Sequence, residues 1–309
     1  MGKALIAMSG GVDSSVAAYL TQQAGYDCIG CMMKLYDPDC AESVTGKTCC
    51  SLDDAQDARS VAMRLGIPFY VFNFKDDFRN KVIRNFIDNY LRGCTPNPCI
   101  DCNRYMKFEK LHHRARELAC DCVVTGHYAR IERREDGFVL RKALDASKDQ
   151  SYVLYSLTQE QLAHTRFPLG TLTKAETRRI AEENGFINAE KPDSQDICFV
   201  PDGDYARVIE TITHRKAEPG DFITTDGKVL GRHKGIIHYT IGQRKGLGIA
   251  ADAPYYVCAI RPDDNTVVLG RPKDLMRATA DAAQMHWIAG RVPNAPIECS
   301  VKIRYRQSE

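Results

Sequence analysis

The segment most informative about the fold is Ser9-Gly10-Gly11-Val12-Asp13-Ser14-Ser15. It follows a short apolar run, residues 4–8, that is typical of a buried strand. It opens a helix-like stretch, residues 14–24, that ends at Gly25. Two adjacent glycines let backbone N–H groups approach an oxyanion, and the start of a helix adds its dipole and its unpaired N–H groups. The segment therefore predicts a phosphate site between a strand and a helix.

The glycine loop is not of the two commonest nucleotide-binding types. It lacks the Lys-Ser/Thr ending of a mononucleotide P-loop, and it lacks the G-x-G-x-x-G spacing of a dinucleotide site. Its S-G-G-x-D-S pattern resembles the pyrophosphate loop of the ATP pyrophosphatases, enzymes that split ATP into AMP and pyrophosphate. In such a loop Ser9, Ser14 and Ser15 would supply hydroxyl donors, and Asp13 would orient the loop or hold Mg²⁺.

Strand-like and helix-like stretches alternate as far as about residue 203. This pattern predicts an α/β domain, a doubly wound parallel sheet of the ATP-pyrophosphatase (adenine nucleotide hydrolase-like) class, over residues 1–203. Farther on, short apolar runs between glycines and prolines are typical of small barrels or sandwiches. We therefore expect a small, mostly β central domain over residues 204–275 and a partial C-terminal β-barrel over residues 276–309.

Composition narrows the class of protein. The chain has 309 residues, which is more than one compact core usually holds, and a formal net charge of +2 that neither demands nor excludes nucleic acid. No apolar run approaches the roughly 20 residues of a membrane span, and we see no signal peptide, so we expect a cytoplasmic protein without a membrane partner. Thirteen cysteines are unusual in a reducing compartment and favour thiol or metal chemistry over disulfides.

Three cysteines are candidates for that chemistry. Cys99 and Cys102 form a C-x-x-C pair in a segment that two prolines are expected to keep out of a helix, and Cys198 lies in a polar segment far along the chain. Two close thiols and a distant third suit either sulfur transfer through a persulfide and a disulfide or three-point ligation of a cluster. Structural zinc would need a fourth ligand, and no partner C-x-x-C with finger-like spacing follows.

Six of the other cysteines are expected to be structural, whereas Cys40, Cys49 and Cys50 flank a polar loop that we expect to be solvated. Cys28 and Cys31 also form a C-x-x-C pair, but alternation along a strand would place their thiols on opposite faces. Four more lie in apolar runs, where cysteine is usually a small buried hydrophobe: Cys120, Cys122, Cys258 and Cys299.

Seven motifs in fixed order carry a closer resemblance. They are S-G-G-V-D-S (9–14), T-P-N-P-x-x-x-C-N (95–103), T-G-H-Y-A (125–129), K-D-Q-S-Y (148–152), D-I-C-F (196–199), H-Y-T-I-G-Q-R-K-G-L-G (238–248) and V-K-I-R-Y-R (301–306). Together they resemble the bacterial tRNA-specific 2-thiouridylases of the ATP pyrophosphatase superfamily over essentially the whole chain. That family is somewhat longer at its C-terminus, so we expect the final β-barrel to be incomplete.

The resemblance implies ATP-dependent 2-thiolation of the wobble uridine of tRNA. A uracil carbonyl is a poor electrophile, so ATP first adenylates its oxygen, and pyrophosphate leaves from a site built on backbone donors and a helix N-terminus. The residues that match the family's ATP site are Ala7, Met8, Ser9, Gly10, Gly11, Val12, Asp13, Ser14, Met33 and Gly126.

The resemblance also assigns the cysteines. Cys102 matches the catalytic nucleophile, and Cys198 matches the residue that carries sulfur as a persulfide; their reaction would leave a disulfide that must be reduced. Target-base contacts match Asn97, Pro98 and Cys99, although the family usually has aspartate at the last position. With three thiols, Cys99, Cys102 and Cys198 also match related thiolation enzymes that hold a [4Fe–4S] cluster. The persulfide and cluster routes both stay open, with ATP and Mg²⁺ as the other cofactors.

The expected macromolecular partners are tRNA and a cysteine desulfurase or sulfur relay protein that donates sulfur. The positions that match tRNA contacts are His127, Lys148, Asp149, Gln150, Arg304 and Tyr305. The basic run Arg130, Arg133, Arg134, Arg141 and Lys142 would follow the phosphate backbone, although such a run is by itself more typical of a solvated hairpin.

Two other functions compete with thiolation. One is another ATP pyrophosphatase that adenylates a carbonyl or carboxylate for amidation, which would have no use for Cys102 or Cys198. The other is a non-catalytic protein that binds metal or RNA, in which the intact glycine loop would have no task.

Overall fold

The computed structural model describes residues 2–36, 52–193, 197–200, 202–305 and 307. Asp196 of the D-I-C-F motif, Arg306 of the last motif and the cysteines of the expected polar loop, Cys40, Cys49 and Cys50, lie outside these residues.

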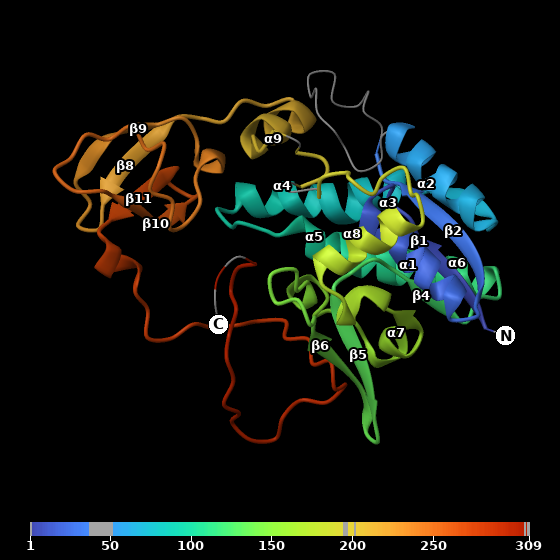
Figure 1. The fold of residues 1–309 in the computed structure, drawn as a ribbon. Coiled ribbons are helices and arrows are strands. Elements are labelled where there is room, and N and C mark those ends of the chain that lie inside the picture. The colour runs from blue at the N-terminus through green and yellow to red at the C-terminus, as the bar shows by residue number, and fades with distance from the viewer. Residues whose placement is uncertain (1, 37–51, 194–196, 201, 306, 308–309) are drawn as a thin grey trace.

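A five-stranded parallel sheet forms the centre of the first domain (Figure 1). Its strands are β1 (Lys3–Ala7), β2 (Asp27–Lys34), β3 (Phe69–Asn73), β4 (Cys122–Val124) and β7 (Thr165–Arg166), and they lie in the order β3-β2-β1-β4-β7. Each neighbouring pair is parallel. Because β1 pairs with β2 on one side and with β4 on the other, the carboxyl ends of β1 and β4 meet at the topological switch point, where open α/β sheets bind ligands.

Helices cover both faces of this sheet. One face packs on α1 (Val12–Gln23), α2 (Leu52–Leu65) and α8 (Lys174–Glu183). The opposite face packs on α3 (Lys75–Phe78), α4 (Arg84–Leu91) and α6 (Leu111–Glu117), with the π-helical segments η2 (Arg79–Ile83) and η3 (Cys102–Lys110). The predicted doubly wound sheet is confirmed.

Alternation along β2 sorts its two cysteines as predicted. Cys28 is buried in the core on the α1 side, while Cys31 is buried in the core on the α4 side. Burial raises the pKa of Cys28 to about 11, so this thiol is a poor nucleophile at neutral pH. Cys122 is buried as expected, but Cys120 and Cys258 are partly exposed and Cys299 is exposed.

A β-hairpin extends the first domain. The basic run forms β5 (Ala129–Arg134) and β6 (Gly137–Lys142), which pack through Ile131, Phe138 and Leu140 on Phe108. Glu132 accepts hydrogen bonds from Arg134 and Arg141, so part of the positive charge of the hairpin is neutralised locally. Short elements complete this region: α5 (Pro98–Asp101), η4 (Ser151–Val153), α7 (Gln159–Ala163) and η5 (Pro168–Thr171).

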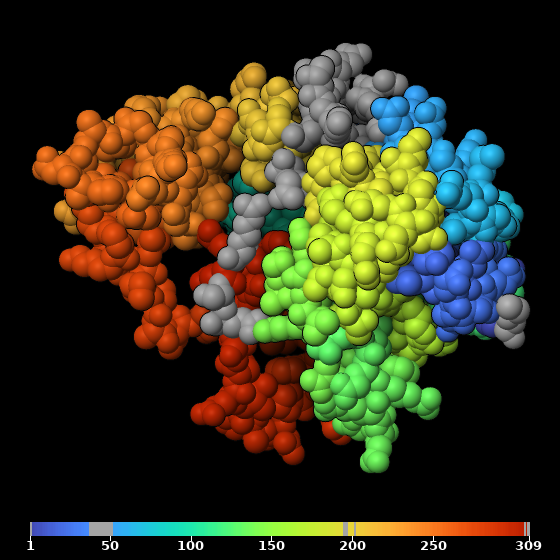
Figure 2. Space-filling model, viewed as in Figure 1, coloured from blue at the N-terminus to red at the C-terminus, as the bar shows by residue number. Residues whose placement is uncertain are grey.

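A smaller β domain follows α9 (Tyr205–Thr213) and stands beside the first domain in Figures 1 and 2. Its strands are β8 (Gly220–Thr224), β9 (Val229–His233), β10 (Tyr256–Arg261) and β11 (Thr266–Gly270), in the order β10-β11-β8-β9. The sheet is open, since β9 and β10 each have one neighbour. Phe222, Val257, Val267 and Leu269 form its core between η6 (Ile236–His238) and the sheet.

The final segment follows η7 (Pro272–Leu275) and forms no strand among its described residues, 276–305 and 307. The partial C-terminal barrel therefore stays a prediction, as do the domain boundaries at residues 203/204 and 275/276. No helix within the described ranges is both long and apolar enough to cross a membrane.

Candidate active site

The glycine loop connects the end of β1 to α1 at the switch point. Gly10 has φ +76°, and a Cβ there would lie 2.3 Å from the carbonyl oxygen of Asp54, so only glycine fits. Gly11 caps α1 without a side-chain hydrogen bond, which leaves the first N–H groups of the helix to a ligand. This arrangement fits an anion such as pyrophosphate.

The loop's hydroxyl groups shape the loop itself. Ser14 Oγ accepts a hydrogen bond from the Ser9 N–H at 3.1 Å and donates to the Gly11 carbonyl at 2.9 Å. Ser15 is fully buried and donates to the same carbonyl at 3.1 Å. The expected hydroxyl donors therefore act first on the conformation of the loop.

Two side chains from the segment after α8 hold the loop from the other side. The amide of Asn188, which is buried, donates to the Gly10 carbonyl and to Ser15 Oγ, both at 2.9 Å. Lys191 Nζ lies 2.6 Å from Asp54 and 2.7 Å from Asp57 on α2, and 3.3 Å from the Gly10 carbonyl. The loop is thus preorganised before any ligand binds.

Gly126 lies just after β4, at the topological switch point, the crevice between the carboxyl ends of β1 and β4. A Cβ on this residue would lie 2.8 Å from the backbone of Asp13 and Ser14, so the glycine allows β4 to end directly against the start of α1. Among the other predicted ATP-site residues, Met8 and Val12 are buried, so only their backbones can face a nucleotide. Ala7 and Met33 are partly exposed at the ends of β1 and β2.

A chain of alternating charges begins at Asp13. Its Oδ1 accepts hydrogen bonds from Lys174 Nζ at 2.7 Å and from the Tyr128 hydroxyl at 2.8 Å. Lys174 also lies 2.7 Å from Asp193, which in turn is 2.9 Å from Lys148. The side chain of Lys174 is only 12% exposed, so this ammonium group is held in the crevice by two carboxylates.

Neighbouring charges in this row of four side chains (Asp13, Lys174, Asp193 and Lys148) stabilise one another. Burial would raise the pKa of Asp193, but hydrogen bonds from Lys174 and Lys148 outweigh it and lower that pKa. The hydrogen bond to Asp193 raises the pKa of Lys148. Burial, followed by the neighbouring Asp13 carboxylate, raises the pKa of Tyr128, so its hydroxyl stays protonated and donates to Asp13. At neutral pH Asp193 and Lys148 are therefore both ionised.

The C-x-x-C pair lies at the start of a helix, contrary to the expectation that its prolines would exclude one. Pro98 is the first residue of α5, a position where its missing N–H costs nothing, and Asn97 Oδ1 caps the helix by accepting from the Cys99 N–H at 3.1 Å. Cys102 begins η3, a π-helical segment of the kind that is frequent at functional sites. Cys99 is exposed and Cys102 is partly exposed.

Cys198 reaches the same region from the segment before α9. Phe199 anchors it, since its ring lies 5.8 Å from Phe78 and 5.2 Å from Phe86, edge-on to both. The Tyr36 hydroxyl donates to the Cys198 carbonyl at 3.0 Å. Cys102 and Cys198 pack against the same hydrophobic core, and both are partly exposed. Within the described ranges, no three His, Cys, Asp or Glu side chains are arranged to hold a metal ion.

Several of the residues predicted to bind tRNA make contacts within the protein. Asp149 accepts from the Ala143 N–H at 2.9 Å, and Gln150 Oε1 accepts from the Tyr128 N–H at 2.9 Å, so both hold their own segment against the crevice. Arg304 donates to the Ile241 carbonyl at 2.6 Å, and the Tyr305 ring lies 6.1 Å from that of Tyr152.

His127 is buried rather than presented to a ligand. Its ring packs on Phe108 and Phe167, its Nδ1 lies 2.7 Å from Thr125 Oγ1, and its Nε2 lies 3.4 Å from Lys107 Nζ. Burial, and then the Lys107 charge, hold the pKa of His127 well below its usual value, so the ring is neutral. A direct contact between His127 and tRNA stays a prediction; in this structure Lys107 is the nearer charge.

Known proteins are similar to this chain in sequence. Family models described as "tRNA methyl transferase HUP domain" and "tRNA methyl transferase PRC-barrel domain" match residues 2–202 and 209–271. The tRNA-specific 2-thiouridylase MnmA of Clostridioides difficile (strain 630) is 50% identical over 305 residues, which are 98% of this chain and 84% of that protein. The protein of the same name from Lachnoclostridium phytofermentans is 49% identical over 99% of this chain and 86% of its own. The chain belongs to the tRNA-specific 2-thiouridylase family.

Solved structures show a more distant similarity. A 4-thiouridine synthetase in complex with RNA and ATP is 21% identical, with a TM-score of 0.44, over 69% of this chain and 50% of its own. The glutamine-dependent NAD+ synthetase of Acinetobacter baumannii is 16% identical, with a TM-score of 0.38, over 59% of this chain and 28% of its own.

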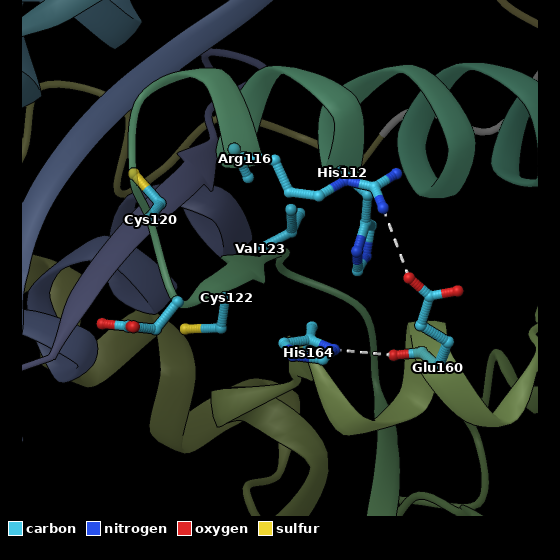
Figure 3. A pocket seen from close by; sticks show the side chains of 9 residues that line it. His112, Arg116, Cys120, Cys122, Val123, Glu160 and His164 are labelled. Carbon is cyan, nitrogen blue, oxygen red and sulfur yellow. Dashed lines mark hydrogen bonds and ion pairs between the residues drawn. The ribbon is translucent and has the colours of Figure 1, made fainter.

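One small cavity of this 2-thiouridylase family member lies away from the glycine loop, beside the amino end of β4 (Figure 3). Its volume is about 60 Å³, and His112, Arg116, Cys120, Cys122 and His164 are among its lining residues. Burial raises the pKa of Cys122 to about 11 and, with the charges of His164 and Arg116, lowers the pKa of His112 to about 4. Neither thiol of this cavity has the lowered pKa of a reactive cysteine.

Sequence reasoning missed several residues of the family member's crevice, above all Lys174, Asp193 and Asn188. The residues around Lys174 carry a local sequence pattern from which its role could have been predicted. Thr173 and Glu176 form a capping box, which marks the helix start, and a lysine in the first turn opposes the helix dipole. Such a lysine needs compensating carboxylates, but the sequence does not reveal which ones.

Proposed function

We propose that this protein catalyses the ATP-dependent 2-thiolation of the wobble uridine of tRNA. The observation that carries the proposal is a preorganised anion loop with the Lys174 ammonium group beside it, at the ends of β1 and β4. The Cys102 and Cys198 thiols pack on the core of the same domain. Family membership at 50% identity supports the same reaction.

The first step is adenylation of the uridine C2 oxygen. The Gly10–Gly11 backbone and the open start of α1 would receive the phosphates of ATP. Lys174 would exchange its contacts with Asp13 and Asp193 for the departing pyrophosphate, whose charge grows as the bond to the α-phosphorus breaks. Mg²⁺ would enter with ATP as part of the substrate, and Asp13 is the carboxylate nearest the loop that could contact it.

The second step is sulfur transfer. The terminal sulfur of a Cys198 persulfide would attack C2 and expel AMP, which leaves uridine C2 joined to Cys198 through two sulfurs. The Cys102 thiolate would then attack Cys198 Sγ, so the sulfur–sulfur bond breaks and its electron pair stays on the sulfur at C2. The products are 2-thiouridine and a Cys102–Cys198 disulfide, which an external thiol must reduce.

We assign the sulfur-transfer step to the persulfide route, because Cys102 and Cys198 match the two thiols that the family resemblance assigns to it. We assign no step to an iron–sulfur cluster. Cys99 follows the helix cap Asn97 and is exposed, which suits the proposed contact with the target base.

Amidation by a related ATP pyrophosphatase is less consistent with the site, because it would leave both Cys102 and Cys198 without a task. Methyl transfer, which the descriptions of the family models mention, would give the glycine loop no phosphate to bind. We further propose tRNA and a cysteine desulfurase or sulfur relay protein as partners and the cytoplasm as the site of action, with the central domain contributing to tRNA binding.

Nucleoside mass spectrometry of tRNA tests the function. Unmodified tRNA is incubated with the protein, ATP and a sulfide or persulfide source, then digested. We expect 2-thiouridine only when ATP and tRNA are both present. Formation of an amidated nucleoside, or no change in the RNA together with pyrophosphate release that does not depend on tRNA, would contradict the proposal.

A further inference from the structure

The H-Y-T-I-G-Q-R-K-G-L-G motif has no role in the chemistry described so far. Its residues 240–248, here called the RK loop, connect η6 to β10 in the central domain. Leu247 is buried in that domain's core with Phe222. The Gln243 side chain accepts from the Thr240 N–H and donates to the Lys245 carbonyl, both at 3.0 Å. The loop is therefore fixed by its own amide bridge and by one apolar anchor.

Two cations project from this fixed loop. Arg244 and Lys245 are exposed, and neither has a carboxylate within ion-pair distance anywhere in the described ranges. Two other exposed cations of the domain have partners: Arg232 pairs with Asp221 at 3.2 Å, and Arg271 lies over the Tyr255 ring. A rigid loop that presents two unpaired cations is a favourable site for a polyanion, because little entropy is lost when it binds.

Glycines make the loop's backbone accessible as well. Gly246 and Gly248 have φ values of +77° and +68°, which other residues rarely adopt. A Cβ at Gly248 would meet nothing within 4 Å, so the backbone there faces open space. Backbone N–H groups flanked by cations are the usual partners of phosphate oxygens in nucleic-acid sites.

The RK loop adjoins the segment that carries the proposed target-base contacts. Thr240 Oγ1 lies 3.4 Å from Oγ1 of Thr95, which precedes Pro96 and Asn97. The Tyr90 hydroxyl also hydrogen-bonds to Thr240, and the Gly93 position packs on Ile260 of β10. The two domains therefore meet where the target base is expected, and the RK loop begins at that contact.

We propose that the RK loop binds the RNA phosphates next to the target uridine, with Arg244 and Lys245 as the contacting side chains. This inference rests on the proposed function and deepens it, because it names the surface that holds the strand once the base has left the anticodon stack. Flipping the base pulls its flanking phosphates toward the protein. A second domain fixed beside the proposed target-base contacts, Asn97, Pro98 and Cys99, can hold them.

The test compares two double variants of the full chain. Arg244→Ala/Lys245→Ala removes the proposed contacts, and Lys228→Ala/Lys273→Ala removes two exposed cations elsewhere on the same domain. Binding of unmodified tRNA and of its isolated anticodon stem–loop is measured by fluorescence anisotropy at several salt concentrations. Steady-state 2-thiouridine formation gives KM for tRNA and for ATP.

We expect Arg244→Ala/Lys245→Ala to bind both RNAs about tenfold or more weakly, with a salt slope reduced by about 1.4, since each single-strand phosphate contact contributes about 0.7. KM for tRNA should rise, while KM for ATP and kcat at saturating tRNA stay unchanged. Lys228→Ala/Lys273→Ala should match the unaltered protein in every measurement.

Three results would overturn the inference: unchanged affinity and slope in the Arg244→Ala/Lys245→Ala variant, an equal loss in the control, or a loss seen with full tRNA but not with the stem–loop. Each presupposes that the unaltered protein binds and thiolates tRNA. If it does neither, the proposed function itself fails, and the two failures are thereby distinguished.

Discussion

Replacing Lys174 by methionine tests the ion chain beside the glycine loop. The substitution keeps the length of the side chain and removes the ammonium group that lies 2.7 Å from both Asp13 and Asp193. Ion pairs this close are worth several kcal/mol at an effective dielectric constant of about 20, before desolvation is subtracted. Asp193 keeps Lys148 and Asp13 keeps the Tyr128 hydroxyl, so we expect a net loss of only about 2 kcal/mol in unfolding free energy.

The loss of activity should be larger than the loss of stability. Removing one group that stabilises transition-state charge typically lowers kcat by about 10²–10³-fold. We therefore expect tRNA-dependent pyrophosphate release by Lys174→Met to fall at least about 100-fold, while the melting temperature falls by roughly 5 °C. Radiolabelled ATP measures the first quantity, and calorimetry measures the second.

Arg178→Met is the matched control. Arg178 lies on the same helix and contacts the same carboxylate, Asp193, at 3.2 Å, but it makes no contact with Asp13. This variant should lose comparable or less stability and keep most of its pyrophosphate release. If folded Lys174→Met releases pyrophosphate at the normal rate, or if Arg178→Met is equally inactive, Lys174 has no special role in phosphate chemistry.

Four further predictions concern other parts of the site. Gly126→Ala should raise KM for ATP by about tenfold or more, because a Cβ would meet the Asp13 backbone at 2.8 Å; an unchanged KM in kinetic assays would refute this. Cys102→Ser and Cys198→Ser should each abolish 2-thiouridine formation and retain tRNA affinity, and thiolation by either variant in the mass-spectrometric assay would exclude the two-thiol mechanism. Cys99→Ser, prepared without oxygen, should keep most of its activity without bound iron, whereas joint loss of iron and activity would favour a cluster. As the pH is lowered from 6.5 to about 4, the free energy of unfolding should fall by roughly 1.4 kcal/mol per pH unit, because the unfolded His112 ring binds a proton that the buried ring does not. Urea unfolding of His112→Gln should show a weaker dependence of this free energy on pH in that range, and an unchanged dependence would refute the assignment.

The sequence predicted the parts of this protein that depend on local patterns. The glycine loop, the strand and helix around it, and the opposite faces of Cys28 and Cys31 follow from short-range rules of turn chemistry and alternation. The resemblance supplied the two thiols, since spacing alone left persulfide and cluster chemistry open.

The parts that could not be predicted depend on contacts between distant segments. Lys174 and Asp13 are separated by 161 residues, and Asn188 reaches the Gly10 carbonyl across 178. No periodicity in a single sequence reports such pairs. The helix at Pro98 is missed for a different reason, because proline disrupts the interior of a helix but favours its first turn. Asn97, a residue type that commonly caps helices, is the local signal for this helix start.

The proposed mechanism splits one ATP into AMP and pyrophosphate for each sulfur placed on a uridine. The most direct measurement determines pyrophosphate and 2-thiouridine in the same reaction, with unmodified tRNA, limiting sulfur donor and an excess of ATP and reductant. We expect equal amounts of the two products, and no pyrophosphate when tRNA is omitted. Release of pyrophosphate without tRNA, or 2-thiouridine formed without pyrophosphate, would contradict the proposed mechanism.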